Sequence, residues 1–218
     1  MNWPGSRDQF PELNPAFADE SGLVFIGGDL HPRRLLAAYC RGIFPWYDES
    51  LPICWWSPDP RAIFELDAIH VSRRLKRTIR SGKFQVTVNQ DFSGVIRGCA
   101  DREEGTWLVP EMIDAYETLH RLGFAHSVEA WQDGELAGGV YGVAIGGFFA
   151  GESMFTRRRD GSKVAFVALA DRLRQRGFTL FDTQFLTEHT ARMGAIEIPK
   201  SQYLRRLRDA LNVKTTFA

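Results

Sequence analysis

The stretch from Leu136 to Phe155 reads LAGGVYGVAIGGFFAGESMF. Its apolar residues form two runs, Leu136 to Ala144 and Phe148 to Met154, and Gly146-Gly147 separates them. Two apolar runs joined by a glycine pair are typical of a β-hairpin. Glycine inside a strand marks a bulge or the close approach of a ligand. We therefore predict a hairpin, whose glycines indicate either a bulge or the close approach of a ligand.

Regular elements continue on both sides of this hairpin. Upstream, Ala125 to Trp131 is strand-like and ends at Asp133-Gly134, a second hairpin signal. Downstream, Ser162 to Arg176 has the apolar spacing of a helix, and Thr179 to Thr183 is a short strand. Two small helices follow. The hairpin therefore belongs to an antiparallel meander that a helix connects to a further strand.

Helices and strands also alternate before the meander. The expected elements are a strand at Ala62–Leu66, a helix capped by Ser72 that runs to about Arg80, a strand at Phe84–Val88, a helix from Asp91 to Cys99, and a helix from Pro110. This order predicts an α+β fold with a mixed, mostly antiparallel sheet.

The first sixty residues have a different character. Residues 1–22 form an irregular arm, Leu23–Ile26 is a short apolar run, and Pro32 opens a helix that runs to about Arg41. Residues 43–61 hold much aromatic mass and too many prolines for regular structure. They form either a hydrophobic plug between two halves of the protein or the wall of a ring-binding pocket. We predict a small N-terminal domain, 1–60, and a larger domain, 61–218.

The composition limits the class of protein. The chain has 218 residues, 44% of them hydrophobic and 25% charged, with a formal net charge of zero. The three cysteines are widely spaced and form no Cys-x-x-Cys pair, and the five histidines show no short ligand spacing. His126 and His189 are interpreted as structural, hydrogen-bonded histidines. We therefore predict no metal, no cofactor, a cytoplasmic location and a monomer.

One predicted helix is strongly basic. At about 100° per residue, one arc of the helix that Ser72 caps carries four cations, which are Arg73, Lys76, Arg77 and Arg80. Leu75 and Ile79 point the other way, towards a core. No acidic residue lies between His70 and Gln90. A solvated surface helix would explain the charges, but the one-sign face favours contact with an RNA backbone.

Two of the predicted strands carry carboxylate or amide side chains that are candidates for a functional site. Glu152 lies between small and apolar neighbours, and it is either a solvent-facing residue or an anionic anchor in a pocket. Asp182 and Gln184 follow an apolar pair, and in a regular strand they project to the same face. They form either a turn or a polar group at the end of a strand, where clefts are common.

Seven segments in this order resemble the leucyl/phenylalanyl-tRNA–protein transferase family. They are Gly27–Leu30, Arg41–Trp46, Trp55–Arg61, Glu103–Trp107, His126–Glu129, Gly151–Phe155 and Asp182-x-Gln184. Each segment alone is weak evidence, whereas seven in order are specific. The resemblance implies a GNAT-type acyltransferase domain behind a smaller N-terminal domain. It also implies transfer of Leu, Phe or sometimes Met from tRNA to proteins that begin with Arg or Lys, which marks them for degradation.

The resemblance also implies a role for individual residues. It places the terminal adenosine of the tRNA between Trp46 and Trp107, and the acceptor stem on Arg73, Arg77 and Arg80. The donor side chain would occupy a pocket formed by Phe149, Met154, Phe166, Leu169 and Phe181. Tyr116 is grouped with these residues as a substrate-binding residue. Glu152, Asp182 and Gln184 would form the reaction centre.

Two positions depart from the family pattern. Val140 stands where the family often has Met, and Phe181 replaces a smaller aliphatic residue, so the pocket is expected to differ in shape.

Two rival functions remain at this stage. One is a coenzyme A-dependent N-acetyltransferase, whose phosphate cradle would lie at Arg158–Lys163 but is incomplete because it ends in Lys. The other is a tRNA-binding module without catalysis, which leaves the reaction-centre residues unexplained.

Overall fold

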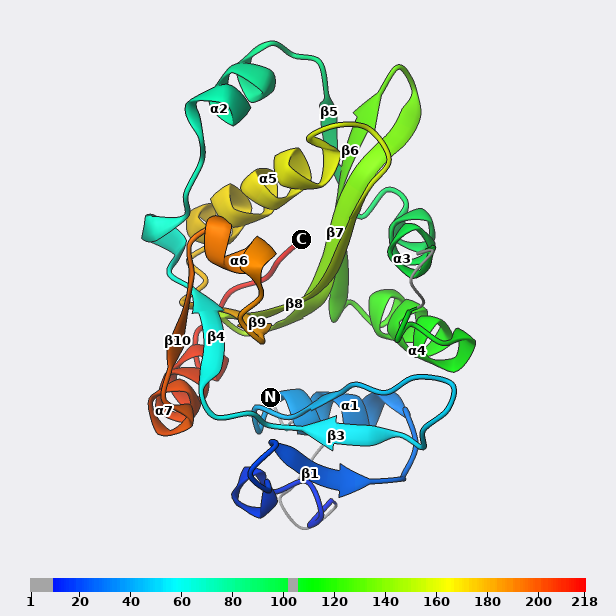
Figure 1. The fold of residues 1–218 in the computed structure, drawn as a ribbon, viewed down its shortest axis with the longest axis vertical. Helices are drawn as coiled ribbons and strands as arrows, with labels where there is room; N and C mark the ends of the chain where they lie inside the picture. Colours follow the sequence, from blue (N-terminus) through cyan, green and yellow to red (C-terminus); the bar gives the residue numbers. More distant parts are fainter. Residues whose placement is uncertain (1–9, 102–105) are drawn as a thin grey trace.

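The computed structural model describes residues 10–101 and 106–218, and it contains two sheets (Figure 1). The smaller, antiparallel sheet has the order β1-β3-β2, with β1 at Leu23–Ile26, β2 at Phe44–Pro45 and β3 at Cys54–Trp56. The helix α1, Pro32–Tyr39, connects β1 to β2. These elements lie together at one end of the molecule.

The larger sheet has the order β10-β4-β9-β8-β7-β6-β5. Its strands are β4 (Arg61–Phe64), β5 (Gln85–Val88), β6 (Ala125–Gln132), β7 (Glu135–Ile145), β8 (Phe148–Thr156), β9 (Leu180–Gln184) and β10 (Ala195–Ile198). Every pairing is antiparallel except that of β8 with β9. The predicted α+β class and the mixed, mostly antiparallel sheet are therefore confirmed.

Helices cover both faces of this sheet (Figure 1). One face carries α3 (Phe92–Ala100) and α4 (Pro110–Arg121), and the other carries α5 (Gly161–Gln175). The remaining helices are α2 (Arg73–Arg80), α6 (Glu188–Arg192) and α7 (Lys200–Leu211), with short 3-10 turns at Pro15–Phe17 and Leu66–Ala68. None of the helices within the described ranges is long and apolar enough to cross a membrane.

The central hairpin of β7 and β8 is confirmed, and other backbone segments of the chain closely approach two of its glycines. The register shifts between Tyr141 and Gly142, which is the bulge that glycine predicted. A Cβ on Gly142 would lie 2.1 Å from the carbonyl oxygen of Ala150, and one on Gly138 would lie 2.5 Å from the amide nitrogen of Ser162. Both glycines are therefore needed for packing against neighbouring backbone.

The connection through α5 decides where the polar residues meet. It returns the chain so that β9 pairs in parallel with β8, with Phe149 opposite Phe181 and Ala150 opposite Asp182. Glu152 and Gln184, which follow these pairs on the two strands, therefore lie close together. The end of β9 faces the smaller sheet and α1 (Figure 1).

Two expectations about secondary structure were wrong. Residues 43–61 do form regular structure, because β2 and β3 pair and the indole of Trp55 donates to the carbonyl oxygen of Gly27 at 2.9 Å. The edge strand β10 was not expected between the two C-terminal helices. It has only four residues, so its pattern is too short to separate it from a loop.

One hydrophobic core connects the two sheets. It includes Leu35 and Tyr39 of α1, Trp55 of β3, and Tyr116 and Val143 beneath the larger sheet, all of them buried. The chain passes from one sheet to the other near residue 60, and the division into domains 1–60 and 61–218 stays a prediction.

Candidate active site

A cavity of about 550 Å³ opens where the end of β8 and β9 faces the smaller sheet. It is bounded by the segment around Trp46, by β8 and β9, and by α6. Of the residues that were predicted to form the site, seven line it, namely Trp46, Trp107, Glu152, Met154, Phe166, Phe181 and Gln184. The structure therefore brings residues 46 to 184 into one site.

Aromatic residues form the outer wall of this cavity. Trp46 is 44% exposed, although its ring contacts those of Trp56 and Phe185 at centroid distances of 5.8 and 5.7 Å. The indole of Trp56 donates to the carbonyl oxygen of Trp46 at 2.6 Å, which fixes the backbone there. Trp107 lines the same cavity. An exposed, supported indole provides a flat face on which a planar ring can stack.

The inner part of the cavity is apolar. Phe64, Val140, Met154, Phe166 and Phe181 line it, and the Phe181 ring lies 5.0 Å from that of Phe64 and 5.7 Å from that of Phe166. Val140 and Phe181, the two positions expected to depart from the family pattern, therefore both line this pocket.

Two residues expected in the pocket lie behind its wall. Phe149 and Leu169 are buried, and neither lines the cavity. The Phe149 ring instead packs edge-on against Phe181, with centroids 5.6 Å apart. They support the pocket rather than contact its contents.

Glu152 lies on the cavity wall, and its hydrogen-bond donors are uncharged. Tyr116 donates to its Oε2 at 3.0 Å, and the hydroxyl of Tyr39 lies 2.5 Å from that of Tyr116. Gln184 donates its Nε2 to the other carboxylate oxygen at 3.4 Å. Burial raises the pKa of Glu152 to about 7, against the opposing effect of the two tyrosine hydroxyls. The carboxyl group is therefore close to half-protonated at neutral pH.

Tyr116 was grouped with the substrate-binding residues, but it is fully buried and does not line the cavity. It acts on the cavity through Glu152. Burial, followed by the charge of Glu152, raises the pKa of its phenol well above the usual value, so the phenol remains a neutral donor.

Asp182 lies behind the same wall and is fully buried. Its two carboxylate oxygens accept from Nε and Nη2 of Arg61 at 2.8 and 2.6 Å. Tyr203 of α7 donates to Oδ2 at 3.0 Å. Removing one partner of such a buried pair is strongly destabilising, because the other charge is left without compensation.

Gln184 lines the cavity although Asp182 does not, so the regular strand expected for these residues is interrupted. Ala62 pairs with Gln184 but the next residue, Ile63, pairs with Asp182, which makes Thr183 the extra residue of a bulge. Gln184 itself has a φ of 61°, in the left-handed region that non-glycine residues rarely adopt. Such backbone geometry clusters at functional sites.

The basic helix α2 lies next to this cavity. Ser72 caps it as expected, and Leu75 is its buried residue, whereas Arg73, Lys76, Arg77 and Arg80 are all exposed. A small cavity of about 120 Å³ between α2, α5 and α6 shares Phe166 and His189 with the larger one. The larger cavity contains no residue of α2, so the tRNA-binding role of this helix stays a prediction.

The comparisons with known proteins agree with this geometry. Residues 63–208 match the sequence profile described as leucyl/phenylalanyl-tRNA protein transferase, and residues 28–59 match that of its N-terminal domain. A leucyl/phenylalanyl-tRNA–protein transferase of Solidesulfovibrio magneticus is 58% identical over 90% of this chain and 81% of its own length. This chain belongs to the leucyl/phenylalanyl-tRNA–protein transferase family. The family and the enzyme class, an aminoacyltransferase, are confirmed.

Further relatives have the same name. A protein of Anaeromyxobacter sp. (strain Fw109-5) is 55% identical over 94% of this chain and 88% of its own length. A solved ribosomal-protein-alanine N-acetyltransferase from Brucella melitensis biovar Abortus 2308 is 22% identical over 44% of this chain and 75% of that chain, with a TM-score of 0.33. A likeness of that extent carries no argument about function.

The segment that an acetyltransferase would use for a phosphate is built differently in this member of the family. Asp160 precedes α5, and its carboxylate accepts from both terminal nitrogens of Arg74 at 2.9 and 3.1 Å. The amide of Ser162 donates to Thr156 at 3.2 Å. The Asp160 carboxylate therefore pairs with α2 and makes no side-chain cap at the start of α5.

Other expectations about single residues had mixed outcomes. Ile79 is 38% exposed, so its assignment to a core was wrong. His126 is a hydrogen-bonded, buried histidine as expected, with contacts to Asn89 at 3.0 Å and to the carbonyl oxygen of Gly123 at 3.2 Å. His189 is exposed and lines the cavity, where its ring meets the sulfur of Met154 at 3.4 Å. Glu103 and Glu104 lie outside the described residues.

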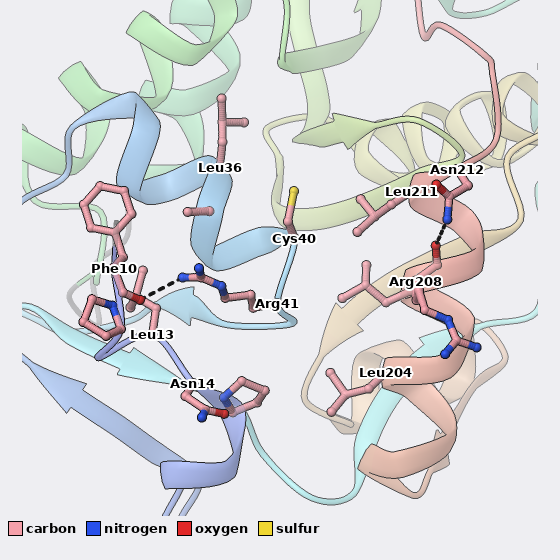
Figure 2. Close-up of a pocket in the computed structure, with 14 residues that line it drawn as sticks. Phe10, Leu13, Asn14, Leu36, Cys40, Arg41, Leu204, Arg208, Leu211 and Asn212 are labelled. Atoms are coloured by element: carbon pink, nitrogen blue, oxygen red, sulfur yellow. Dashed lines mark hydrogen bonds between the residues drawn. The ribbon is translucent and has the colours of Figure 1, made fainter. Parts of the chain in front are cut away.

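A larger cavity of about 650 Å³ lies elsewhere, between Phe10–Pro15, α1 and α7 (Figure 2). Leucines of α1 and α7 provide much of its lining, and Arg41 donates to the carbonyl oxygen of Phe10 at 2.9 Å. Burial raises the pKa of its one thiol, Cys40, to about 12, which disfavours the thiolate form. None of the predicted site residues lines it.

Sequence analysis missed three residues of the site, Arg61, Tyr39 and Tyr203. Arg61 belonged to a matching segment but received no role. The sequence pattern that could have indicated its role is an arginine at the start of an otherwise apolar strand, because a buried charge requires a partner. The tyrosines gave no local signal, because apolar helix faces commonly include tyrosine.

Proposed function

We propose that this cavity transfers Leu, Phe or Met from aminoacyl-tRNA to the N-terminal Arg or Lys of an acceptor protein, marking it for degradation. The observation that carries the proposal is the contact of Glu152 with Gln184 between an aromatic wall and an apolar pocket. The family supports the reaction class. A cytoplasmic location and a monomeric state belong to the same proposal.

The tRNA end would be held by the outer wall and by α2. Stacking of a base on an aromatic side chain contributes about 1–3 kcal/mol, and Trp46 and Trp107 would receive the terminal adenosine in this way. The exposed cations Arg73, Lys76, Arg77 and Arg80 would contact acceptor-stem phosphates. Such contacts position the RNA without reading its sequence.

The donor side chain would enter the apolar pocket formed by Phe64, Val140, Met154, Phe166 and Phe181. Burying a Leu or Phe side chain contributes about 1.5–3 kcal/mol. A branched Cβ would clash in a slot that first admits a methylene, so Ile and Val are rejected.

The reaction is aminolysis of an activated ester. The neutral α-amino nitrogen of the acceptor attacks the ester carbonyl, a C–N bond forms, and the bond to the terminal ribose oxygen breaks. The amine loses a proton and the ribose oxygen gains one. No redox cofactor or high-energy cofactor is needed. Holding both reactants together can contribute about 7–11 kcal/mol.

The three polar residues would divide the positioning. Gln184 donates its Nε2 to Glu152, which turns the amide oxygen away from that carboxylate and towards an incoming amine. Asp182 holds Gln184 by accepting from its backbone amide at 3.0 Å. Ionised Glu152 would pair with the basic side chain of the acceptor. The acceptor is then fixed at both its amine and its side chain.

The deciding experiment is transfer of labelled Leu or Phe from charged tRNA to a peptide beginning with Arg. The matched controls are Ile-charged and Val-charged tRNA, and the same peptide beginning with Gly. We expect transfer only from the Leu and Phe donors and only to the Arg peptide. Binding of charged tRNA without any transfer would indicate the non-catalytic tRNA-binding module instead.

A second experiment tests the basic helix. Replacement of Arg77 by Gln should weaken tRNA binding and reduce the dependence of binding on salt by about one phosphate contact. Replacement of Arg74, which is paired with Asp160, is the control and should change the slope less. Equal slopes for the Arg77 variant and the unaltered protein would contradict the assignment of α2 to RNA.

A further inference from the structure

A fully buried arginine lies behind the wall of the reactive cavity. Arg61, the first residue of β4, is 1% exposed. Its Nη1 donates to the carbonyl oxygen of Gly42 at 3.0 Å, while Nε and Nη2 donate to Asp182. The rings of Phe44 and Tyr203 lie 4.7 and 4.5 Å from its guanidinium carbon. Arg61 therefore connects the segment after α1, strand β9 and helix α7.

The partner carboxylate has no capacity left for a substrate. Oδ1 of Asp182 accepts from Arg61 and from the backbone amide of Gln184, and Oδ2 accepts from Arg61 and Tyr203. An ionised carboxylate offers about four acceptor positions, and these contacts use that number. Asp182 is also 0% exposed and does not line the cavity.

The residue that Asp182 holds has an uncommon backbone conformation. Gln184 adopts a φ of 61° at the end of a bulged strand, and its amide proton points to Asp182. A non-glycine residue keeps a left-handed backbone conformation only where the surrounding structure imposes it. Among the described residues, the Asp182 carboxylate accepts this amide proton, and Arg61 fixes that carboxylate at both oxygens. The orientation of the Gln184 side chain thus depends on a residue that it does not touch.

We infer that Arg61 is a positioning residue of the transfer reaction, which acts through Asp182 to hold the left-handed turn that aims the Gln184 amide into the cavity. Asp182 then belongs to the positioning pair and takes no proton from the substrate. The inference rests on the proposed function for its kinetic consequence only. The planar guanidinium is essential, because lysine provides one point charge and cannot fix two oxygens at once.

The kinetic test uses Arg61→Lys, Gln184→Ala and the double variant. Single-turnover transfer from Phe-charged tRNA to the Arg peptide should fall on the order of 10²-fold for Arg61→Lys, because small misplacements have effects of that size. Its affinity for charged tRNA should stay within a few-fold of the unaltered protein. In the Gln184→Ala background, Arg61→Lys should cause little further loss, because both changes remove the same aimed amide.

A matched control separates this role from general destabilisation. Arg206 makes an equally bidentate pair with Glu65, at 2.6 and 2.9 Å, away from the cavity. Arg206→Lys should leave the transfer rate unchanged. If Arg61→Lys lowers the rate by the same factor with and without Gln184, the inference is overturned.

A second readout does not depend on activity. Hydrogen exchange of the Gln184 backbone amide should accelerate in Arg61→Lys relative to the amides of β7, and should not change in Arg206→Lys. Unchanged protection at Gln184 overturns the inference even if the protein proves not to be a transferase. Failure of the unaltered protein to transfer Phe would reject the proposed function and leave this result to stand alone. If Arg61→Lys does not fold, Asp182→Asn is used with the same expectations.

Discussion

The reactive cavity and the layer directly behind it each contain a carboxylate, and the two are placed in opposite surroundings. Glu152, on the cavity wall, is held by the neutral hydroxyl of Tyr116 and the neutral amide of Gln184. Asp182, behind the wall, is held by the cation of Arg61. The pKa of Glu152 is raised to about 7, whereas Asp182 is held in an ion pair.

Under the proposed function, the difference in surroundings gives these two carboxylates different roles. A carboxylate without a protein cation can accept a cation from a substrate, whereas a carboxylate that is already paired can only hold its neighbours in place. Four changes test whether this division is correct, in order of decreasing expected effect.

Replacement of Asp182 by Ala should have the largest effect. It leaves the Arg61 charge buried without a partner, so the free energy of unfolding should fall by about 3–5 kcal/mol. Transfer should be lost while binding of charged tRNA is largely kept, as long as the protein is folded. Urea unfolding and filter binding measure the two quantities.

The matched control is Glu65→Ala, which breaks the partly exposed pair with Arg206 and should cost about 0.2–1 kcal/mol. Equal destabilisation by the two replacements would mean that the buried layer is not special. Equal loss of transfer and of tRNA binding in Asp182→Ala would reject its placement behind the reaction centre.

Replacement of Glu152 by Gln should mainly weaken the acceptor. A charged hydrogen bond contributes about 1.5–3 kcal/mol, so kcat/KM for the Arg peptide should fall about 10- to 100-fold. The affinity for charged tRNA should not change. Steady-state kinetics at fixed tRNA, with Gln184→Ala as the comparison, would separate a KM effect from a kcat effect. A pure loss of kcat in Glu152→Gln would contradict the anchoring role.

The pH dependence should distinguish the two carboxylates. The pKa of Glu152 is raised to about 7 from 4.5. The folded state therefore binds more protons than the unfolded state between these values, and the contribution of Glu152 to stability is present below pH about 4.5 and lost as pH rises through about 7. Relative to the unaltered protein, Glu152→Gln should become progressively more stable over this window.

The affinity for the acceptor should increase as the pH rises, because only ionised Glu152 attracts the basic side chain. Affinity for an N-acetylated Arg peptide, which has no titrating amine, should weaken as the pH falls below about 7. The same measurement on Glu152→Gln should be flat. An equal pH dependence in both proteins would assign the titration to another group.

Replacement of Tyr116 by Phe should have the smallest effect. It removes a hydrogen bond of about 1.5–3 kcal/mol to ionised Glu152, but the hydroxyl of Tyr39 still favours the ionised form. The pKa of Glu152 should then rise, because the Tyr116 hydroxyl also favours the ionised form. The inflection in peptide affinity should move to higher pH.

The sequence could predict the elements whose signals are local. Ser72 and Asp91 cap their helices through side-chain contacts to Leu75 and Gly94, and Pro110 opens the next helix, all within a few residues of the chain. The central hairpin followed from its glycines. The family motifs then supplied the residues of the cavity wall, and most of them line one cavity.

The other features of the candidate site depend on contacts between residues far apart in the sequence, which no local sequence pattern predicts. The ion pair of Arg61 with Asp182 joins residues 121 positions apart, and it holds Asp182 behind the cavity wall, whereas Gln184 lines the cavity. The alternatives for Glu152, solvent or pocket, could be separated only by the tyrosines from α1 and α4. The bulge at Thr183 also arises from pairing with β4 and not from the sequence of β9.

The hydrogen bond from Tyr203 to Asp182 has a consequence for the order in which the site is completed during synthesis of the chain. Its hydroxyl belongs to α7, so a nascent polypeptide that has not yet been extended to residue 203 lacks one of the donors to Asp182. The residues of α2 are synthesised much earlier. A product that stops before α7 would thus contain the cationic residues of α2 but lack one of the contacts that hold Asp182.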